Sequence, residues 1–204
     1  MTIFDRRTAL VVVDVQNDFA DPAGSLFVPG GEAVVPIVND VAWSAIRDGA
    51  FVVYTADWHP ERTPHFAADG GIWPVHCVGG TWGAAFHPDL EVLGPWVRKG
   101  SGGEDGYSGF TMRDPQSLDG PGGAETSTEL ADLLRVRGIA RVVVCGLATD
   151  YCVQATALDG IRLGFEVDLL EDAVAAVELA PGDGAAAVAA MVAAGVGLRR
   201  ARPS

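Results

Sequence analysis

Three side chains that could carry covalent or proton-transfer chemistry each follow an apolar run typical of a buried strand. Asp14 comes directly after Ala9–Val13, Lys99 follows the run Val92–Val97, and Cys152 lies shortly after a third such run. In open α/β sheets, ligands bind beyond the carboxyl ends of the strands, so these side chains are expected to converge at one sheet edge. Together they would supply a thiol nucleophile, a carboxylate that shuttles protons and an ammonium that stabilises negative charge.

Cys152 is the candidate nucleophile because a helix predicted to start near Thr149 or Asp150 places it in the first helical turn. Backbone N–H groups and the helix dipole favour an anion there, so the sequence predicts a lowered pKa for its thiol. The alternative is that Cys152 is a small buried residue, which is what we expect for Cys145 and Cys77.

Asp14 interrupts a run that should be buried, and a buried carboxylate is costly without a partner. The natural partner is Lys99, which is the only lysine in the chain; the other 13 of its 14 basic residues are arginines. Asp14 therefore has either a capping or ion-pair role or a role in proton transfer. Its combination with Lys99 and Cys152 favours proton transfer.

The histidines form a second candidate site. Asp57 and His59 stand one residue apart and are followed by His65 and His76. Carboxylate oxygen and imidazole nitrogen without thiolate suit a divalent ion such as zinc, iron(II) or manganese(II), and three or four such ligands leave a coordination position open. The sequence predicts one divalent metal ion here. The alternative is a set of structural histidines, which is what we expect for His87.

The elements that must position these residues alternate between short Val-rich runs and helical stretches. This pattern is typical of a doubly wound α/β domain whose parallel sheet is buried on both faces. The predicted strands are Ala9–Val13, Phe51–Thr55, Arg141–Cys145, Phe165–Leu169 and Val196–Leu198.

Four helices are predicted between these strands. Apolar residues recur at helical spacing from Val34 to Ala45, and Thr126 with Glu129 has the spacing of a capping box ahead of a second helix. The third helix is the one that carries the candidate nucleophile. An Ala-rich stretch predicts the fourth over Gly184–Ala194.

Two long segments interrupt this alternation, Asp57–Asp89 and Gly100–Gly123. Long loops inside a compact domain are usually functional or disordered. The first segment carries all four histidines and three of the five tryptophans, which indicates a functional role. The second is Gly-rich but matches neither the Walker pattern nor a strand–GxGxxG–helix context, so nucleotide binding is not expected. Without an internal repeat or a linker, residues 1–204 are expected to form one domain.

Composition narrows the class of protein further. A formal net charge of -13 argues against binding to nucleic acid or to an anionic membrane surface. No apolar run approaches the ~20 residues that a bilayer-spanning helix needs. Three cysteines at irregular spacing make a poor disulfide framework and suit a reducing compartment. We therefore expect a cytoplasmic protein.

Five motifs occur in the order of one known family between residue 9 and about residue 160. They are Asp14-Val15-Gln16-Asn17-Asp18-Phe19, Asp57-Trp58-His59-Pro60, Trp73-Pro74-Val75-His76-Cys77, Lys99-Gly100 and Gly146-Leu147-Ala148-Thr149-Asp150-Tyr151-Cys152-Val153. In these motifs the chain resembles the nicotinamidases (pyrazinamidases) of the isochorismatase-like cysteine hydrolase superfamily.

The resemblance implies a mainly parallel six-stranded sheet with helices on both faces. It also implies a metal-dependent amidohydrolase that converts nicotinamide to nicotinic acid and ammonia through a cysteine thioester. The same enzyme would also hydrolyse pyrazinamide. Its small-molecule partner would be an aromatic amide, and its role would be in NAD salvage. A homo-oligomer is possible in this family. The implied site residues are Asp14, Lys99 and Cys152 for catalysis, the amides of Ala148 and Cys152 for the oxyanion, Phe19, Trp73 and Tyr107 for the substrate, and Asp57, His59, His65 and His76 for the metal.

Two details follow from the same resemblance. The peptide bond between Leu147 and Ala148 is expected to be cis. The segment Thr111–Glu125 is longer than in compact bacterial members of the family. This difference puts in doubt whether the chain shares the loop contacts or the oligomer interface of those members, but not whether it shares their chemistry.

Other functions compete with this interpretation. Amidases of the same superfamily that act on carbamoyl or ureido substrates share the acid, the lysine and the cysteine but lack the metal set of Asp57, His59 and His76. Isochorismatase itself hydrolyses a vinyl ether without using the cysteine. A non-catalytic metal-binding protein on this fold would not need the intact catalytic set.

Overall fold

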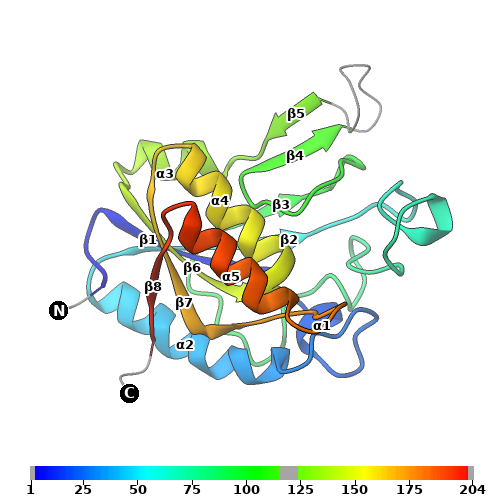
Figure 1. The fold of residues 1–204 in the computed structure, drawn as a ribbon, viewed down its shortest axis with the longest axis horizontal. Coiled ribbons are helices and arrows are strands. Elements are labelled where there is room, and N and C mark those ends of the chain that lie inside the picture. Colours follow the sequence, from blue (N-terminus) through cyan, green and yellow to red (C-terminus); the bar gives the residue numbers. More distant parts are fainter. Residues whose placement is uncertain (1–2, 115–123, 202–204) are drawn as a thin grey trace.

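The computed structural model describes residues 3–114 and 124–201. One sheet organises the fold: six strands, all parallel, lie in the order β3-β2-β1-β6-β7-β8 (Figure 1). The predicted doubly wound α/β architecture is therefore confirmed. The strands of this sheet are β1 (Thr8–Val13), β2 (Phe51–Asp57), β3 (Trp96–Lys99), β6 (Arg141–Leu147), β7 (Glu166–Ala175) and β8 (Gly197–Arg199).

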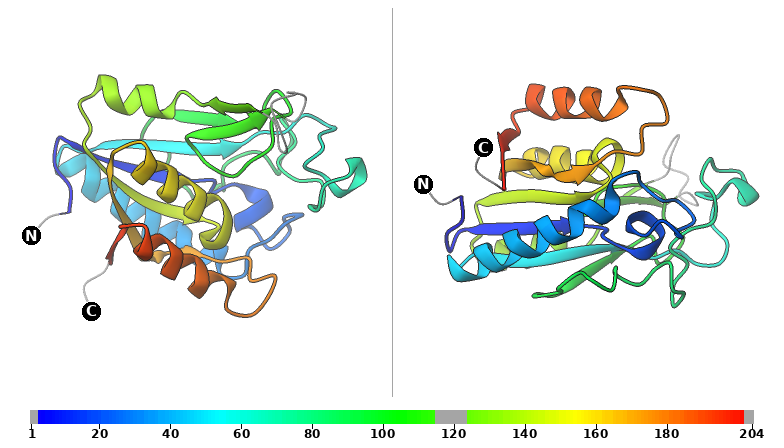
Figure 2. Two further views of the ribbon diagram at one scale, coloured as in Figure 1. Left: turned by 45° about the horizontal axis from the view of Figure 1, so that its top comes forward. Right: turned by 90° about the horizontal axis from the view of Figure 1, so that it is seen from below.

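Helices cover both faces of the sheet. Figure 2 shows α2 on one side and α4 and α5 on the other. The helices are α1 (Asn17–Ala20), α2 (Gly31–Arg47), α3 (Leu130–Val136), α4 (Gln154–Arg162) and α5 (Asp183–Ala193).

The central strand β1 shows why both faces must be covered, since all six of its residues are buried. Leu10 and Val12 pack in the core with the apolar stripe of α2, whereas Val11 and Val13 pack with α3, α4 and α5 on the opposite face. Successive side chains of a strand point to opposite faces, so a run without polar residues fits a strand covered on both sides.

A small antiparallel hairpin replaces part of what the sequence predicted as helix. Its strands are β4 (Thr111–Asp114) and β5 (Ala124–Ser127), and Thr126 pairs with Met112 within it. The predicted capping box is therefore wrong. Instead, the side chain of Thr128 accepts a hydrogen bond from the N–H of Leu130, the first residue of α3, at 3.2 Å. Most of the longer segment noted in Thr111–Glu125, residues 115–123, lies outside the described residues.

The helical segment that carries Cys152 starts at Thr149, as expected, but its first turn is π-helical. This turn, η2 (Thr149–Val153), follows β6 and continues into α4. Cys152 is buried within it. The other expected helices, from Val34 to Ala45 and over Gly184–Ala194, agree with α2 and α5.

The carboxyl ends of β1, β2, β3 and β6 are neighbours in this sheet, so the residues that follow these strands gather at one edge. The long segment after β2 contains only a short 3-10 turn, η1 (Ala67–Asp69), and extends beyond the same edge (Figure 1). None of the helices in residues 3–114 and 124–201 is long and apolar enough to cross a membrane.

Candidate active site

Asp14, Lys99 and Cys152 lie in contact at this edge, and all three are buried. The Lys99 ammonium lies 2.9 Å from Oδ2 of Asp14 and donates a hydrogen bond to Sγ of Cys152 at 3.4 Å. Thr55, on β2, donates to the other oxygen of Asp14 at 2.7 Å. Asp14 adopts a left-handed backbone conformation with φ of 46°, which ends β1 and belongs to the strained backbone often found at functional sites. The structure thus joins the three predicted catalytic side chains.

The pKa of the Cys152 thiol contradicts its sequence-based prediction. Burial raises this pKa well above the ordinary value, against the opposing effect of the Lys99 ammonium. The expectation of a lowered pKa assumed a partly exposed helix end, whereas the thiol is buried beside the carboxylate of Asp14. Burial also raises the pKa of Asp14. A protonated thiol beside a carboxylate of raised pKa is an arrangement in which the proton can pass from sulfur to oxygen as attack begins.

Lys99 also connects this triad to the second candidate site. Its Nζ lies 2.9 Å from Oδ1 of Asp57, whose Oδ2 lies 3.2 Å from Nε2 of His59 and 3.4 Å from Nε2 of His76. Burial alone would raise the pKa of Asp57, but Lys99 and His59 hold it well below its ordinary value. Asp57 is therefore an anion shared between the ammonium and the histidines.

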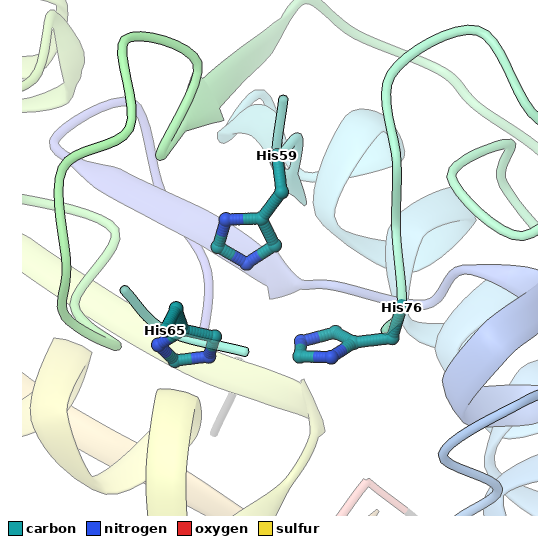
Figure 3. Close-up of side chains that lie close together, drawn as sticks. All are labelled: His59, His65 and His76. Atoms are coloured by element: carbon teal, nitrogen blue, oxygen red, sulfur yellow. The ribbon is translucent and has the colours of Figure 1, made fainter. Parts of the chain in front are cut away.

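The three predicted histidines converge, as Figure 3 shows for the rings of His59, His65 and His76. One nitrogen from each ring lies within 4.8 Å of the others, and all three residues are buried. Nδ1 of His76 lies 2.8 Å from the carbonyl oxygen of Pro74 and Nδ1 of His65 lies 2.6 Å from Oδ1 of Asp105. These outer partners accept hydrogen bonds, so each Nδ1 can donate its proton to them and leave Nε2 available as a metal ligand.

Imidazole nitrogens and an anionic carboxylate that face one another are the donor set that a divalent cation binds. The cluster of His59, His65 and His76 with Asp57 is therefore chemically suited to a divalent metal ion, in agreement with the predicted donor set. Gly100 leaves room for the ring of His59: its φ is 77°, and a Cβ there would approach Nδ1 of His59 to 2.9 Å. By contrast His87, expected to be structural, accepts a hydrogen bond from the N–H of Asp89 at 3.2 Å and is not in the cluster.

A pocket opens between the two groups of residues, with about 340 Å³ of empty space including its mouth. The predicted substrate residues Phe19, Trp73 and Tyr107 line it, and Trp73 donates a hydrogen bond from Nε1 to the Tyr107 hydroxyl at 3.0 Å. Ala148 and Cys152, predicted to bind the oxyanion, line it as well. The peptide bond between Leu147 and Ala148 is cis, as expected.

Several residues that lie around the pocket were not identified from the sequence. Buried Gln16 accepts a hydrogen bond from the N–H of Asp57 at 2.8 Å and donates one to its carbonyl at 2.7 Å, which fixes the backbone of that residue. Gln16 lies in the first motif, so its position was available as a signal. Tyr151 also lines the pocket and lies in the fifth motif, whereas Leu26 and Val177 are apolar residues outside the motifs.

Comparison with known proteins agrees with this geometry. The family model of the isochorismatase domain matches residues 8–201. A nicotinamidase of Escherichia coli (strain K12) is 36% identical, over 93% of this chain and 93% of its own. Among solved structures, the pyrazinamidase of Pyrococcus horikoshii in complex with zinc is 40% identical, with a TM-score of 0.81 over 95% of this chain and 99% of its own.

A third similar protein is PnC1 from L. infantum, solved in complex with nicotinate. It is 40% identical and has a TM-score of 0.85, over 98% of this chain and 96% of its own. Each of these similarities extends over at least 93% of this chain. The matched family model, which spans almost every described residue, shows that this chain belongs to the isochorismatase family.

Proposed function

We propose that the protein is a metal-dependent nicotinamidase, which hydrolyses nicotinamide to nicotinic acid and ammonia and accepts pyrazinamide as a related ring amide. The observation that carries the proposal is one pocket lined by aromatic side chains, by Cys152 of the buried Cys152–Lys99–Asp14 group and by two members of the histidine cluster. Nicotinamide has matching chemistry, with a primary amide at one end and a pyridine nitrogen at the other. The relatives named above, a nicotinamidase and a nicotinate complex among them, support it.

In the first half of the reaction, Asp14 takes the proton of the Cys152 thiol while the sulfur attacks the amide carbon. The electron pair of the carbonyl moves onto its oxygen, which the backbone amides of Ala148 and Cys152 would bind. Losing one such donor typically costs ~3 kcal/mol of barrier. Asp14 then gives its proton to the amide nitrogen as the carbon–nitrogen bond breaks, and ammonia leaves. Lys99 stabilises the negative charge on sulfur before the thioester forms.

In the second half, Asp14 takes a proton from water, whose oxygen attacks the thioester carbon. The carbon–sulfur bond breaks, and the Cys152 sulfur recovers its proton from Asp14. The net change is one amide and one water converted to one carboxylic acid and one ammonia. Asp14 thus takes up a proton twice and releases it twice, which a buried carboxylate of raised pKa beside the thiol is suited to do.

The residues that would hold the metal are Asp57, His59, His65 and His76. A divalent ion supplies a Lewis-acid position that can orient the ring nitrogen of the substrate, rather than an activated water. Zinc, iron(II) and manganese(II) all suit this donor set, and the zinc complex of the similar pyrazinamidase makes zinc the first ion to test. Phe19 and Trp73 would hold the ring between them, with Tyr107 closing the pocket.

We also propose that residues 1–204 act as one domain in the cytoplasm. All six strands of the main sheet belong to one continuous layer. The three cysteines of the chain are free and buried, which suits a reducing compartment.

The direct test is release of ammonia from nicotinamide by the purified chain. We expect turnover of nicotinamide and pyrazinamide, and little turnover of linear carbamoyl or ureido amides that lack a ring nitrogen. Turnover confined to the linear amides would favour the rival amidase, and a chain that releases ammonia from none of them would be a non-catalytic member of the family.

Removal of metal is expected to suppress this activity. Treatment with a strong chelator followed by desalting should lower kcat/KM at least about a hundredfold, since the substrate loses its oriented position. Addition of stoichiometric zinc, iron(II) or manganese(II) should restore it. Activity that is indifferent to both treatments would remove the metal from the mechanism.

His76→Ala should weaken metal binding because it removes one of the clustered nitrogens. We expect the metal content of the purified variant, measured by mass spectrometry of the element, to fall well below one ion per chain. His87→Gln is the matched control, since His87 is a buried histidine outside the cluster. Full occupancy in His76→Ala would contradict the proposed ligand set.

A further inference from the structure

Of the three clustered histidines, His65 has a carboxylate as the partner of its outer ring nitrogen. Oδ1 of Asp105 lies 2.6 Å from Nδ1 of His65. The corresponding nitrogen of His76 faces a backbone carbonyl, and Nδ1 of His59 is buried without a hydrogen-bond partner among the described residues. His65 therefore has an ionic contact that the other two rings lack.

Asp105 is held rigidly although its side chain is about half exposed. Its N–H donates to the carbonyl of Arg113 at 2.7 Å, and the N–H of Arg113 donates back to the carbonyl of Asp105 at 2.7 Å. Arg113 belongs to β4, so the hairpin fixes the backbone of Asp105. A carboxylate fixed in this way loses little conformational freedom when it bonds to an imidazole.

The contact is one of several that join the segment 105–107 to the segment 65–73, since the Tyr107 ring also packs against the rings of His65 and Trp73. Two residues after Asp105, the Tyr107 hydroxyl accepts the hydrogen bond of Trp73. The hydrogen bond of Asp105 thus reaches a proposed metal ligand, and that of Tyr107 reaches an aromatic residue that lines the pocket. Each of these hydrogen bonds can be removed without removing the other, so their effects can be tested independently.

We propose that Asp105 is a positioning residue for the metal centre: its carboxylate accepts the Nδ1 proton of His65 and so directs the Nε2 lone pair toward His59 and His76. The inference rests on the metal site of the proposed function. A carboxylate partner fixes the tautomer and the orientation of a metal-binding imidazole and makes its other nitrogen more basic. Without it, the proton can move to Nε2 and the ring can turn, and either change removes a metal donor.

The test measures zinc affinity of the full chain, by competition with a chromophoric chelator after the metal has been removed. Loss of such an outer partner typically weakens metal binding by about tenfold to a hundredfold, and we expect this for Asp105→Ala. Asp105→Asn should lie between the unaltered chain and Asp105→Ala, because an amide oxygen still accepts the proton but has no charge.

Two control variants distinguish positioning of His65 by Asp105 from a general loosening of the segment 104–107. Glu104→Gln alters a neighbouring carboxylate that accepts the N–H of Gly102 and has no contact with His65. Tyr107→Phe removes the hydrogen bond to Trp73 and keeps the ring that packs against His65. Both should bind zinc within about twofold of the unaltered chain, whereas Tyr107→Phe should raise KM for nicotinamide. The visible absorption of the Co²⁺-loaded chain should change in Asp105→Ala and remain the same in Glu104→Gln.

A double-variant cycle with His65→Ala decides whether Asp105 acts through His65. If it does, Asp105→Ala causes no further loss of zinc affinity once His65 is alanine. Equal losses in the two backgrounds, or an Asp105→Ala variant within about twofold of the unaltered chain, would overturn the positioning role while leaving the metal site intact. An unaltered chain that binds no zinc, iron(II) or manganese(II) would instead overturn the metal site itself. Asp105→Asn provides the same comparison if the alanine variant fails to fold.

Discussion

Replacing Cys152 with alanine is expected to abolish the release of ammonia from nicotinamide, with a loss in kcat on the order of 10⁴-fold or more. The physical reason is that Cys152 brings a nucleophilic sulfur to the pocket, 3.4 Å from the Lys99 ammonium. Without it, the pocket can still bind and orient the amide but cannot form the acyl intermediate. Measurement of ammonia over long incubations would detect the residual rate.

Cys145→Ala is the matched control for this variant. Cys145 is equally buried, but it lies within β6, where burial raises the pKa of its thiol with no charged partner. We expect that variant to retain turnover. Mass spectrometry of unaltered enzyme quenched during turnover should find the acyl group on Cys152. Substantial turnover by Cys152→Ala would rule out the covalent route.

Lys99→Arg is expected to cause the second largest effect, a loss of about a hundredfold or more in turnover together with lower stability. The ammonium lies 2.9 Å from both Asp14 and Asp57, and its side chain is 1% exposed. A planar guanidinium is larger and presents its donors in a fixed fork, so it cannot occupy the same space between two carboxylates and a thiol. Overpacking of this kind typically costs 1–3 kcal/mol of stability, a range that the free energy of unfolding in denaturant would test.

Lys99→Met distinguishes the shape of the side chain from its charge. It leaves Asp14 and Asp57 buried without their shared cation, a change that typically costs about 3–5 kcal/mol. Burial alone would lower the pKa of Lys99, but the two carboxylates raise it well above its ordinary value, so the charge is present throughout the working pH range. Arg98→Lys is the control, because Arg98 is exposed and stacks on Trp58 and Trp96. Near-normal turnover by Lys99→Arg would mean that the single lysine is an accident of composition.

Much of the fold could be predicted because it depends on local patterns. The uninterrupted apolar run of β1 and the helical spacing in α2 are properties of consecutive residues, and both elements formed where expected. The hairpin was missed because β4 and β5 are short strands of four residues with polar sequences, TMRD and AETS. Such strands form only through pairing with each other, which no local pattern encodes.

The sequence by itself determined which chemical groups are present and at which strand ends they lie. Motif order and the rule that parallel strands end at one edge were sufficient to bring Asp14, Lys99 and Cys152 together, and the metal cluster with them. Only the tertiary structure decided the protonation and partners of these groups. Burial raises the pKa of the Cys152 thiol although its position in the first turn of a helix suggested the opposite, and Asp105 reaches His65 from 40 residues away. Both outcomes depend on what surrounds an atom in space, because solvation and hydrogen bonding act over a few ångströms, whatever the separation along the chain.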